Sequence, residues 1–166
     1  MIYLNIGSNL PSLNGGRKNN IEKAINHLKD LKFNLIKLSS FYETPSYPDK
    51  SNPKFINLCV KLETKLKPLI FLDKIKEIET KLGRTRLKKN EPRTCDIDII
   101  DYNHEIIKMN NSFDLTLPHP RLELRNFVLL PLFEISKNWN HPVNKLSIIK
   151  LISFLKDEDL RAIKKI

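Results

Sequence analysis

The chain has 166 residues, 40% of them hydrophobic, and its 29 basic and 19 acidic side chains give a formal net charge of +10. This length allows one hydrophobic core and leaves no room for a second catalytic domain, so we expect a single, monomeric domain over residues 1–166. No apolar run approaches the roughly 18 residues that span a membrane, and the N-terminus begins like a strand instead of a signal peptide. We therefore expect a cytoplasmic protein without membrane partners. Cys59 and Cys95 lie in strand-like segments without a Cys-x-x-Cys motif and are interpreted as reduced core thiols.

The basic charge could reflect nucleic-acid binding, because clustered cations are the usual footprint of contacts with a phosphate backbone. The lysines, however, are scattered along the whole chain, and only residues 81–93 concentrate basic side chains. That segment suits a small polyphosphate better than a duplex. The composition therefore predicts small-molecule partners and no nucleic acid.

Apolar spacing predicts alternating strands and helices along the chain. The expected order is strand 2–6, helix 17–31, strand 33–43, strand 55–64, helix 68–82 and strand 95–102, followed by helices over 129–135 and 145–155. Residues 45–53 contain three prolines, so they form neither a helix nor a central strand, and they are long enough to cover a site. The order β-α-β-β-α-β predicts an α+β, ferredoxin-like fold, in which helices pack on an antiparallel sheet and further helices follow at the C-terminus.

The strand expected over residues 95–102 carries two acids at alternate positions. Because side chains alternate between the faces of a strand, Asp96 and Asp98 should share one face while the apolar residues between them face a core. Carboxylates completed by phosphate and water oxygens are the usual ligands of Mg²⁺. An edge strand with acids on its solvent face would show the same spacing. Phosphate chemistry is favoured by the basic flank, which consists of Arg84, Arg86, Lys88, Lys89 and Arg93.

Neither common glycine-rich nucleotide fingerprint is present. The glycines of Gly7-Ser8-Asn9-Leu10 and Gly15-Gly16-Arg17-Lys18 do not fit G-x-x-x-x-G-K-[ST], and no G-x-G-x-x-G occurs. ATP, if bound, must therefore be held by side chains and metal ions.

A set of short motifs follows one another between residues 7 and 135. They are Gly7-Ser8-Asn9-Leu10, Ser39-Ser40-Phe41-Tyr42-Glu43-Thr44-Pro45, Phe55-Ile56-Asn57, Gly83-Arg84-Thr85-Arg86, Pro92-Arg93-Thr94-x-Asp96-Ile97-Asp98, and Pro118-His119-Pro120-Arg121 running on to Arg125-Asn126-Phe127-Val128-Leu129. In this order the motifs resemble those of the 6-hydroxymethyl-7,8-dihydropterin pyrophosphokinase family of folate biosynthesis. The resemblance implies an enzyme that transfers the terminal pyrophosphate of ATP to the hydroxymethyl group of this pterin and releases AMP.

The resemblance also implies the residues of the nucleotide side. It places Asp96 and Asp98 on two Mg²⁺ ions that bridge the triphosphate of ATP, and Arg84 and Arg93 around the transferred group. These four residues form the expected catalytic set. The expected ATP contacts are Glu79, Arg84, Arg86, Arg93, Thr116, His119, Arg121 and Arg125. His119 lies in a Pro-His-Pro sequence, which fits a rigid turn equally well.

The residues expected to bind the pterin are predicted partly from strand geometry and partly from the resemblance. Phe55 and Asn57 occupy positions i and i+2 of a predicted strand and should project from the same face. The ring can stack on a flat pterin, and the amide offers a donor and an acceptor to the pterin edge. The resemblance adds Phe127 as the opposite stacking face, although core packing is the alternative for both phenylalanines. The expected loop contacts are Thr44, Pro45 and Tyr47.

Two features depart from the family pattern. Residues 87–91 lack the Trp that many members carry there, since the only Trp is Trp139, and Phe113 and Asp114 occupy a region where some members have an Arg. We expect the loops over 45–53 and 87–91 to become ordered only when both substrates are bound.

Two other functions remain open from the sequence. A magnesium-dependent nucleotidyltransferase of the palm type also sets paired acids on an antiparallel sheet, but it gives no reason for Phe55 and Asn57. A basic RNA-binding module without chemistry gives no reason for Asp96 and Asp98, which would repel phosphate in the absence of metal.

Overall fold

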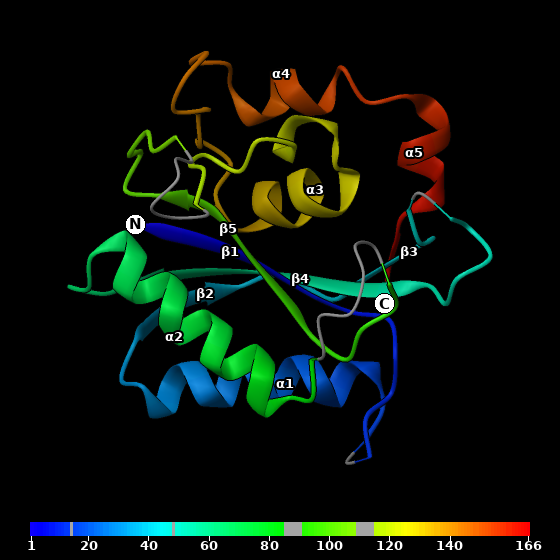
Figure 1. Cartoon of the computed structure of the whole chain (residues 1–166). Helices are drawn as coiled ribbons and strands as arrows, with labels where there is room; N and C mark the ends of the chain where they lie inside the picture. The colour runs from blue at the N-terminus through cyan, green and yellow to red at the C-terminus, as the bar shows by residue number, and fades with distance from the viewer. Residues whose placement is uncertain (14, 48, 85–90, 109–114) are drawn as a thin grey trace.

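The computed structural model describes residues 1–13, 15–47, 49–84, 91–108 and 115–166 (Figure 1). Its elements are β1 (Ile2–Ser8), α1 (Arg17–Asp30), β2 (Asn34–Leu38), β3 (Tyr42–Thr44), β4 (Phe55–Glu63), α2 (Pro68–Lys81), β5 (Asp96–Tyr102), the 3-10 turn η1 (Leu122–Leu124), α3 (Asn126–Ile135), α4 (Ile148–Ile152), α5 (Asp157–Ala162) and β6 (Lys164–Lys165). Arg86, the loop residues 87–90, Phe113 and Asp114 lie outside the described residues. Within the described part of the chain, no helix is long and apolar enough to cross a membrane.

One antiparallel sheet forms the centre of the molecule. Its strands follow the order β5-β1-β4-β3-β6, and β2 pairs with β4 next to β3. All the described strand pairs are antiparallel. These observations confirm the predicted α+β class, with β2 and β3 together taking the place of the single strand expected over residues 33–43.

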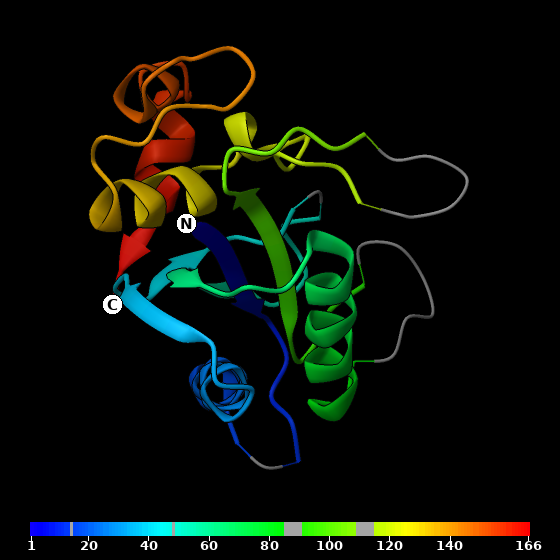
Figure 2. The ribbon, with the colours of Figure 1, turned by 90° about the vertical axis from the view of Figure 1, so that its left-hand side faces the viewer.

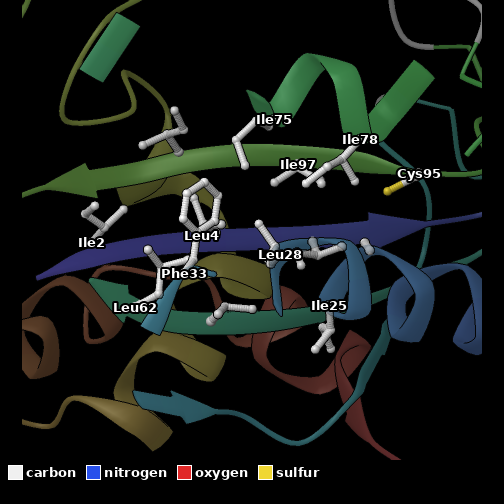
Figure 3. Packing of buried hydrophobic residues seen from close by; sticks show 14 of the residues in the cluster. Ile2, Leu4, Ile25, Leu28, Phe33, Leu62, Ile75, Ile78, Cys95 and Ile97 are labelled. Atoms are coloured by element: carbon white, nitrogen blue, oxygen red, sulfur yellow. The ribbon is translucent and has the colours of Figure 1, made fainter. Parts of the chain in front are cut away.

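Helices cover both faces of the sheet (Figures 1 and 2). α1 and α2 lie on one face, where Leu4 of β1, Leu28 of α1 and Ile75 of α2 pack into the larger apolar cluster (Figure 3). α3 and α4 lie on the opposite face, where Ile100 and Trp139 belong to a second cluster. The sheet therefore has two buried faces, and a polar site must lie at an edge or an end of it.

β5 divides its side chains between these two faces. Ile97 and Ile99 belong to the cluster under α1 and α2, so Asp96 and Asp98 point toward the α3 face, as their spacing predicts. Ile100 also faces α3, as the alternation requires, and because the pairing with β1 shifts by one residue after Ile99, the next residue, Asp101, lies on this face too and accepts from Trp139 Nε1 at 2.7 Å. This β-bulge ends the simple alternation just beyond the two acids.

The prediction of one continuous strand over residues 33–43 is wrong, because the chain forms two strands there, β2 and β3. Leu38 pairs with Val60 and Tyr42 pairs with Asn57, so three residues lie opposite two residues of β4. At this break Ser39 donates its N–H to the Cys59 carbonyl, and its hydroxyl accepts the Cys59 N–H, both at 2.9 Å. The serine side chain keeps the β4 backbone hydrogen-bonded where the neighbouring strand is interrupted.

The C-terminal elements also differ from the prediction. The helix expected over 129–135 begins earlier, at Asn126. The helix expected over 145–155 covers only Ile148–Ile152, because Lys145 has a left-handed φ of 62° and Ser147 caps the helix through the Lys150 N–H. α5 and β6 were not predicted, and β6 consists of two lysines without apolar alternation.

Candidate active site

The candidate site lies where the end of β1 meets the start of β5, on the α3 face of the sheet. Gly7 pairs with Asp96 and Asn5 pairs with Asp98 across these two strands. Asp96 and Asp98 are partly exposed, at 15% and 27% of their side-chain surface. The carboxylates are thus reachable from solvent on β5, which lies at the edge of the sheet and pairs with β1.

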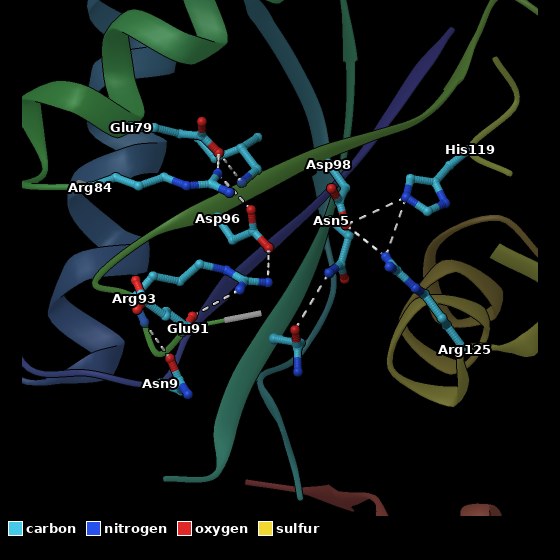
Figure 4. Close-up of polar contacts among 12 residues, drawn as sticks. Asn5, Asn9, Glu79, Arg84, Glu91, Arg93, Asp96, Asp98, His119 and Arg125 are labelled. Carbon is cyan, nitrogen blue, oxygen red and sulfur yellow. Dashed lines mark hydrogen bonds and ion pairs between the residues drawn. The ribbon is translucent and has the colours of Figure 1, made fainter. Parts of the chain in front are cut away.

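Asp96 lies between two arginines (Figure 4). Arg84 Nη1 is 2.6 Å from Asp96 Oδ1, and Arg93 Nη2 donates to Asp96 Oδ2. Arg84 also pairs with Glu79, which lies in the last turns of α2. Burial lowers the pKa of Arg84, but the charges of Asp96 and Glu79 outweigh burial and raise the pKa above its ordinary value. Arg84 therefore remains a cation.

Glu79 connects α2 to β5. Its side chain is 3% exposed, and Oε1 accepts the backbone N–H of Ile97 at 2.8 Å. The same residue helps to line a hollow of about 270 Å³ together with Lys76, Thr80 and Arg84. Glu79 thus fixes both Arg84 and the strand between the two acids, which makes it a support for the predicted nucleotide side.

Asp98 has a different environment from Asp96. Arg125 Nη1 donates to Asp98 Oδ2 at 2.8 Å, and His119 Nε2 lies 3.9 Å from the same oxygen. The Nδ1 atom of His119 accepts the Arg121 N–H at 3.1 Å, and Nε2 lies 3.4 Å from Arg125 Nη1. Burial lowers the pKa of His119, although the charge of Asp98 opposes this effect. His119 is therefore a neutral neighbour of Asp98 near pH 7.

The predicted pterin residues Thr44, Phe55 and Asn57 meet on the paired strands β3 and β4. Thr44 pairs with Phe55, and Asn57 Nδ2 donates to Thr44 Oγ1 at 3.2 Å. Asn57 and Thr44 are buried, at 2% and 3% exposure, whereas Tyr47 is 79% exposed. The structure thus brings the strand residues together and leaves Tyr47 on the surface.

Both predicted stacking rings lie against an arginine. The guanidinium carbon of Arg93 is 5.2 Å from the centre of the Phe55 ring, and that of Arg125 is 5.4 Å from the centre of the Phe127 ring. Such contacts are typical cation–π distances. Phe127 is half-buried and packs against the apolar cluster on the α3 face, so it combines partial core packing with a face turned toward Arg125.

The remaining predicted residues lie at the margin of the site. Pro45 and Thr116 are half-buried, and Arg121 is exposed. Neither Tyr47 nor Thr116 makes a side-chain hydrogen bond to the acids or arginines described here. Their roles remain predictions.

Asn9 also lies in the site, although no role for it was predicted. Its Oδ1 accepts the Arg93 N–H at 2.7 Å and its Nδ2 donates to the Pro53 carbonyl at 3.1 Å. The backbone N–H groups of Asn9 and Leu10 both donate to the Arg93 carbonyl at 3.1 Å. Asn9 therefore ties the segment that carries Arg93 to the segment that leads into Phe55. The motif Gly7-Ser8-Asn9-Leu10 was the available signal.

Gly7 shapes the same region because it has no side chain. A Cβ atom at this position would lie 2.9 Å from Asn57 Oδ1 and 3.5 Å from the Phe55 ring. Any larger residue at position 7 would displace the Asn57 amide.

The protein has an α+β fold whose antiparallel sheet carries two carboxylates, and arginines and two aromatic rings lie beside them. This combination is typical of a small enzyme that binds a polyphosphate and a flat ring. Residues 3–137 match the family model described as 7,8-dihydro-6-hydroxymethylpterin-pyrophosphokinase. Because this match covers most of the chain, the chain belongs to that family.

Curated relatives agree with this assignment. The chain is 38% identical over 142 residues to a 2-amino-4-hydroxy-6-hydroxymethyldihydropteridine pyrophosphokinase of Aquifex aeolicus, covering 86% of this chain and 84% of that protein. It is 37% identical over 138 residues to the protein of the same description from Haemophilus influenzae, covering 83% and 82%. A folic acid synthesis protein of Pneumocystis carinii is 36% identical over 162 residues, which is 98% of this chain but 21% of that longer protein.

Solved structures share the fold. A Plasmodium falciparum HPPK-DHPS variant crystallised with pterin and p-hydroxybenzoate superposes with a TM-score of 0.72 at 18% identity, covering 99% of this chain and 46% of that chain. A second structure of this kind, HPPK-DHPS in complex with substrates, has a TM-score of 0.71 at 16% identity over 99% of this chain and 46% of that chain. The chain thus spans less than half of these solved chains.

Proposed function

We propose that this protein transfers the terminal pyrophosphate of ATP to the hydroxymethyl group of 6-hydroxymethyl-7,8-dihydropterin, giving AMP and the pterin diphosphate in folate biosynthesis. Family membership and the bacterial relatives support this activity. The structural observation that carries it is the arrangement of Asp96 and Asp98 on one strand face between three arginines. Phosphate chemistry needs such cations, and the two acids need a counter-charge when phosphate is bound.

The donor set fits magnesium. Asp96 and Asp98 offer carboxylate oxygens, and no cluster of three or more metal-binding side chains was found among the described residues. A cation here would therefore take its other ligands from phosphate and water, which is how Mg²⁺ is usually held. When bound, Mg²⁺ supplies charge neutralisation and polarisation to the triphosphate. Asp96 and Asp98 would hold it.

The arginines have a second set of acceptors in this proposal. Arg84, Arg93 and Arg125 now pair with carboxylates, and guanidinium groups bind phosphate oxygens with the same forked geometry. When the triphosphate binds, these side chains can exchange carboxylate for phosphate without leaving the site. They would then neutralise the charge that develops on the transferred group.

The reaction itself requires mainly positioning. The pterin hydroxyl oxygen forms a bond to the β-phosphorus while the bond from that phosphorus to the AMP oxygen breaks, and the hydroxyl proton is released. Holding the two reactants in line supplies much of the rate enhancement. Both ring nitrogens of His119 already have neighbours, Arg121 N–H at Nδ1 and Arg125 and Asp98 at Nε2, so we assign it no role as a base. Asp98 is the nearest candidate to accept this proton.

Product analysis tests the proposal. The purified protein is incubated with ATP, Mg²⁺ and the hydroxymethyl dihydropterin, and the products are separated by chromatography and identified by mass. We expect AMP and the pterin diphosphate, with no AMP when the pterin is omitted. Inorganic pyrophosphate with a nucleotidyl product would indicate a nucleotidyltransferase, and the absence of any product would contradict an enzymatic function.

A further inference from the structure

Asn5 is a buried polar residue in the middle of β1 for which neither the motifs nor the proposed reaction accounts. It is 4% exposed, and its neighbours along the strand, Leu4 and Ile6, pack into the cluster on the α1 and α2 face. The Asn5 side chain therefore points to the opposite face, the one that carries the acids. Across the sheet it pairs with Asp98 of β5 and Cys59 of β4. Figure 4 shows it next to Asp98.

Within the described part of the chain, Asn5 makes one side-chain hydrogen bond, and that bond reaches the predicted pterin site. Its Nδ2 donates to Asn57 Oδ1 at 3.4 Å, and Asn57 Nδ2 donates in turn to Thr44 Oγ1 at 3.2 Å. The three side chains form a buried relay from β1 through β4 to β3. Among the described residues, nothing donates to Asn5 Oδ1, which is also buried. Buried carbonyl oxygens without a donor are uncommon in folded proteins.

The orientation of the Asn57 amide decides what it can recognise. Its oxygen accepts and its nitrogen donates, so a half-turn about the last bond exchanges the two functions. Thr44 cannot select one orientation, because a hydroxyl both donates and accepts. Gly7 leaves room for the amide but offers it no polar side chain. Asn5 directs its amide nitrogen toward the Asn57 oxygen, so the orientations of the two amides are coupled through this contact.

We infer that Asn5 is a positioning residue for pterin recognition, because it holds the Asn57 oxygen toward β1 and so presents the matching donor and acceptor to the pterin edge. The inference rests on the proposed function, in which Asn57 reads that edge. It assigns Asn5 no contact with the reacting atoms.

Two substitutions separate orientation from packing. Asn5→Asp keeps the size, and as a carboxylate it can only accept, so its ionised form should draw the Asn57 nitrogen toward β1 and invert the amide. Asn5→Leu has a similar volume and no hydrogen bond, so it leaves the orientation unselected. Tyr3→Phe is the matched control, because Tyr3 lies on the same strand and its hydroxyl makes a hydrogen bond to Ser136 at 2.8 Å, away from the acids.

The measurement is calorimetric titration of each folded variant with the pterin in the presence of Mg²⁺ and an unreactive ATP analogue, and with the analogue alone. We expect both Asn5 variants to weaken pterin binding at least about tenfold, while analogue binding to the uncharged variant Asn5→Leu stays within about twofold and Tyr3→Phe binds like the wild type. The side-chain amide resonances of Asn57 in ligand-free protein should shift in both Asn5 variants and remain in place in Tyr3→Phe. In steady-state kinetics, KM for the pterin should rise with little change in kcat.

The outcomes distinguish the inference from the proposed function. If the wild type binds no pterin, the proposed function fails and the inference fails with it. If the wild type binds pterin and Asn5→Asp binds it equally well, Asn5 does not set the amide orientation, and the inference alone is wrong. Should Asn5→Leu not fold, Asn5→Ala removes the same donor and is judged by the same criteria.

Discussion

Asp96 and Asp98 share one face of a strand but have different partners. Asp96 is held by Arg84 and Arg93, whereas Asp98 meets Arg125 and a neutral His119. A cation that binds both carboxylates must compete with every one of these pairings. A cation that wins this competition would free the arginines to bind phosphate.

We expect Asp96→Asn and Asp98→Asn each to lower turnover by at least about 100-fold, which corresponds to about 2.7 kcal/mol of transition-state stabilisation. The amide keeps the shape of the side chain but removes the charge that holds a metal. AMP release is measured at saturating Mg²⁺ and both substrates. Asp73→Asn, a change at an exposed acid of α2, is the control and should keep full turnover. Near-normal turnover in both site variants would remove the metal assignment.

His141 gives the protein a dependence on pH that is separate from the active site. Burial lowers the pKa of His141, although Glu123 and Asp101 act to raise it. Its Nδ1 accepts the N–H groups of Val143 and Asn144 at 3.2 and 3.3 Å, which a protonated Nδ1 cannot do. The unfolded chain therefore binds the proton more readily. Stability is fully present above the ordinary His pKa of about 6.5 and is lost as the pH falls toward the lowered pKa of the folded state.

We expect His141→Asn to lose less stability than the wild type between about pH 7.5 and pH 5.5. Asn keeps an acceptor for the two backbone N–H groups but does not titrate. Urea unfolding at both pH values measures the difference in free energy. His119 also has a lowered pKa, so some dependence should remain in the variant. An unchanged pH dependence would show that His141 does not contribute.

The helices and strands with strong apolar periodicity were predicted correctly from the sequence. The helices beginning at Arg17 and Pro68 and the strand beginning near Phe55 lie close to their expected positions. The break after Leu38 escaped prediction because it depends on Ser39 bonding to Cys59, a residue of another strand. β6 escaped because two lysines carry no apolar signal and pair only with the neighbouring edge.

In the candidate site, too, local patterns could be predicted and contacts between distant parts of the chain could not. Residues in local motifs, such as Asp96 and Asp98, could be placed on one strand face from spacing alone. Asn5 and Asn9 could not be assigned contacts, because their partners lie 52 and 84 residues away along the chain. Only the folded sheet brings such residues together.

Glu134 of α3 joins elements that are remote in sequence. Its carboxylate accepts the Ser40 N–H and hydroxyl at 3.1 and 2.8 Å and the Tyr42 hydroxyl at 2.9 Å, and it pairs with Lys165 of β6 at 3.2 Å. Burial acts to raise the pKa of Glu134, but these hydrogen bonds lower it. Burial and the neighbouring carboxylate raise the pKa of Tyr42 to about 12. α3 is thereby fixed to the strand that ends at Thr44.

We expect Glu134→Ala to reduce the free energy of unfolding by about 1–3 kcal/mol, because Ser40 and Tyr42 lose their acceptor. Glu22→Ala, at an exposed position on α1, should change it by less than about 0.5 kcal/mol. Chemical denaturation of both variants provides the comparison. Equal stability of the two would show that the contacts of Glu134 do not hold α3 against β3.

At the scale of the whole molecule, the site is built from two similar sets of residues that come from different elements. Each set contains an acid, an arginine that pairs with it, and an aromatic ring under that arginine. The first set is Asp96, Arg93 and Phe55, and the second is Asp98, Arg125 and Phe127. In each set the arginine links the proposed metal position to the proposed pterin position.

The stacking role of Phe127 can be tested separately. If the ring stacks on the pterin, Phe127→Ala should weaken pterin binding by roughly 1–3 kcal/mol and change ATP-analogue binding much less. Calorimetric titration of the folded variant with each ligand gives both values. A loss of thermal stability with unchanged pterin affinity in the folded protein would return Phe127 to a packing role.

The two sets also predict that the substrates bind cooperatively. Arg93 and Arg125 lie against the rings that the pterin would use. A triphosphate with Mg²⁺ would draw both guanidinium groups away from the acids and toward phosphate, and so expose the ring faces. We expect Mg²⁺ with an unreactive ATP analogue to tighten pterin binding at least about tenfold, or about 1.4 kcal/mol. Linkage requires the pterin to tighten analogue binding by the same factor, so both titrations are measured.

Arg125→Lys keeps the charge but loses the flat group over the ring, so the coupling between the two substrates should be smaller in this variant. Pterin affinity that is the same with and without the analogue would show that the arginines do not obstruct the pterin position.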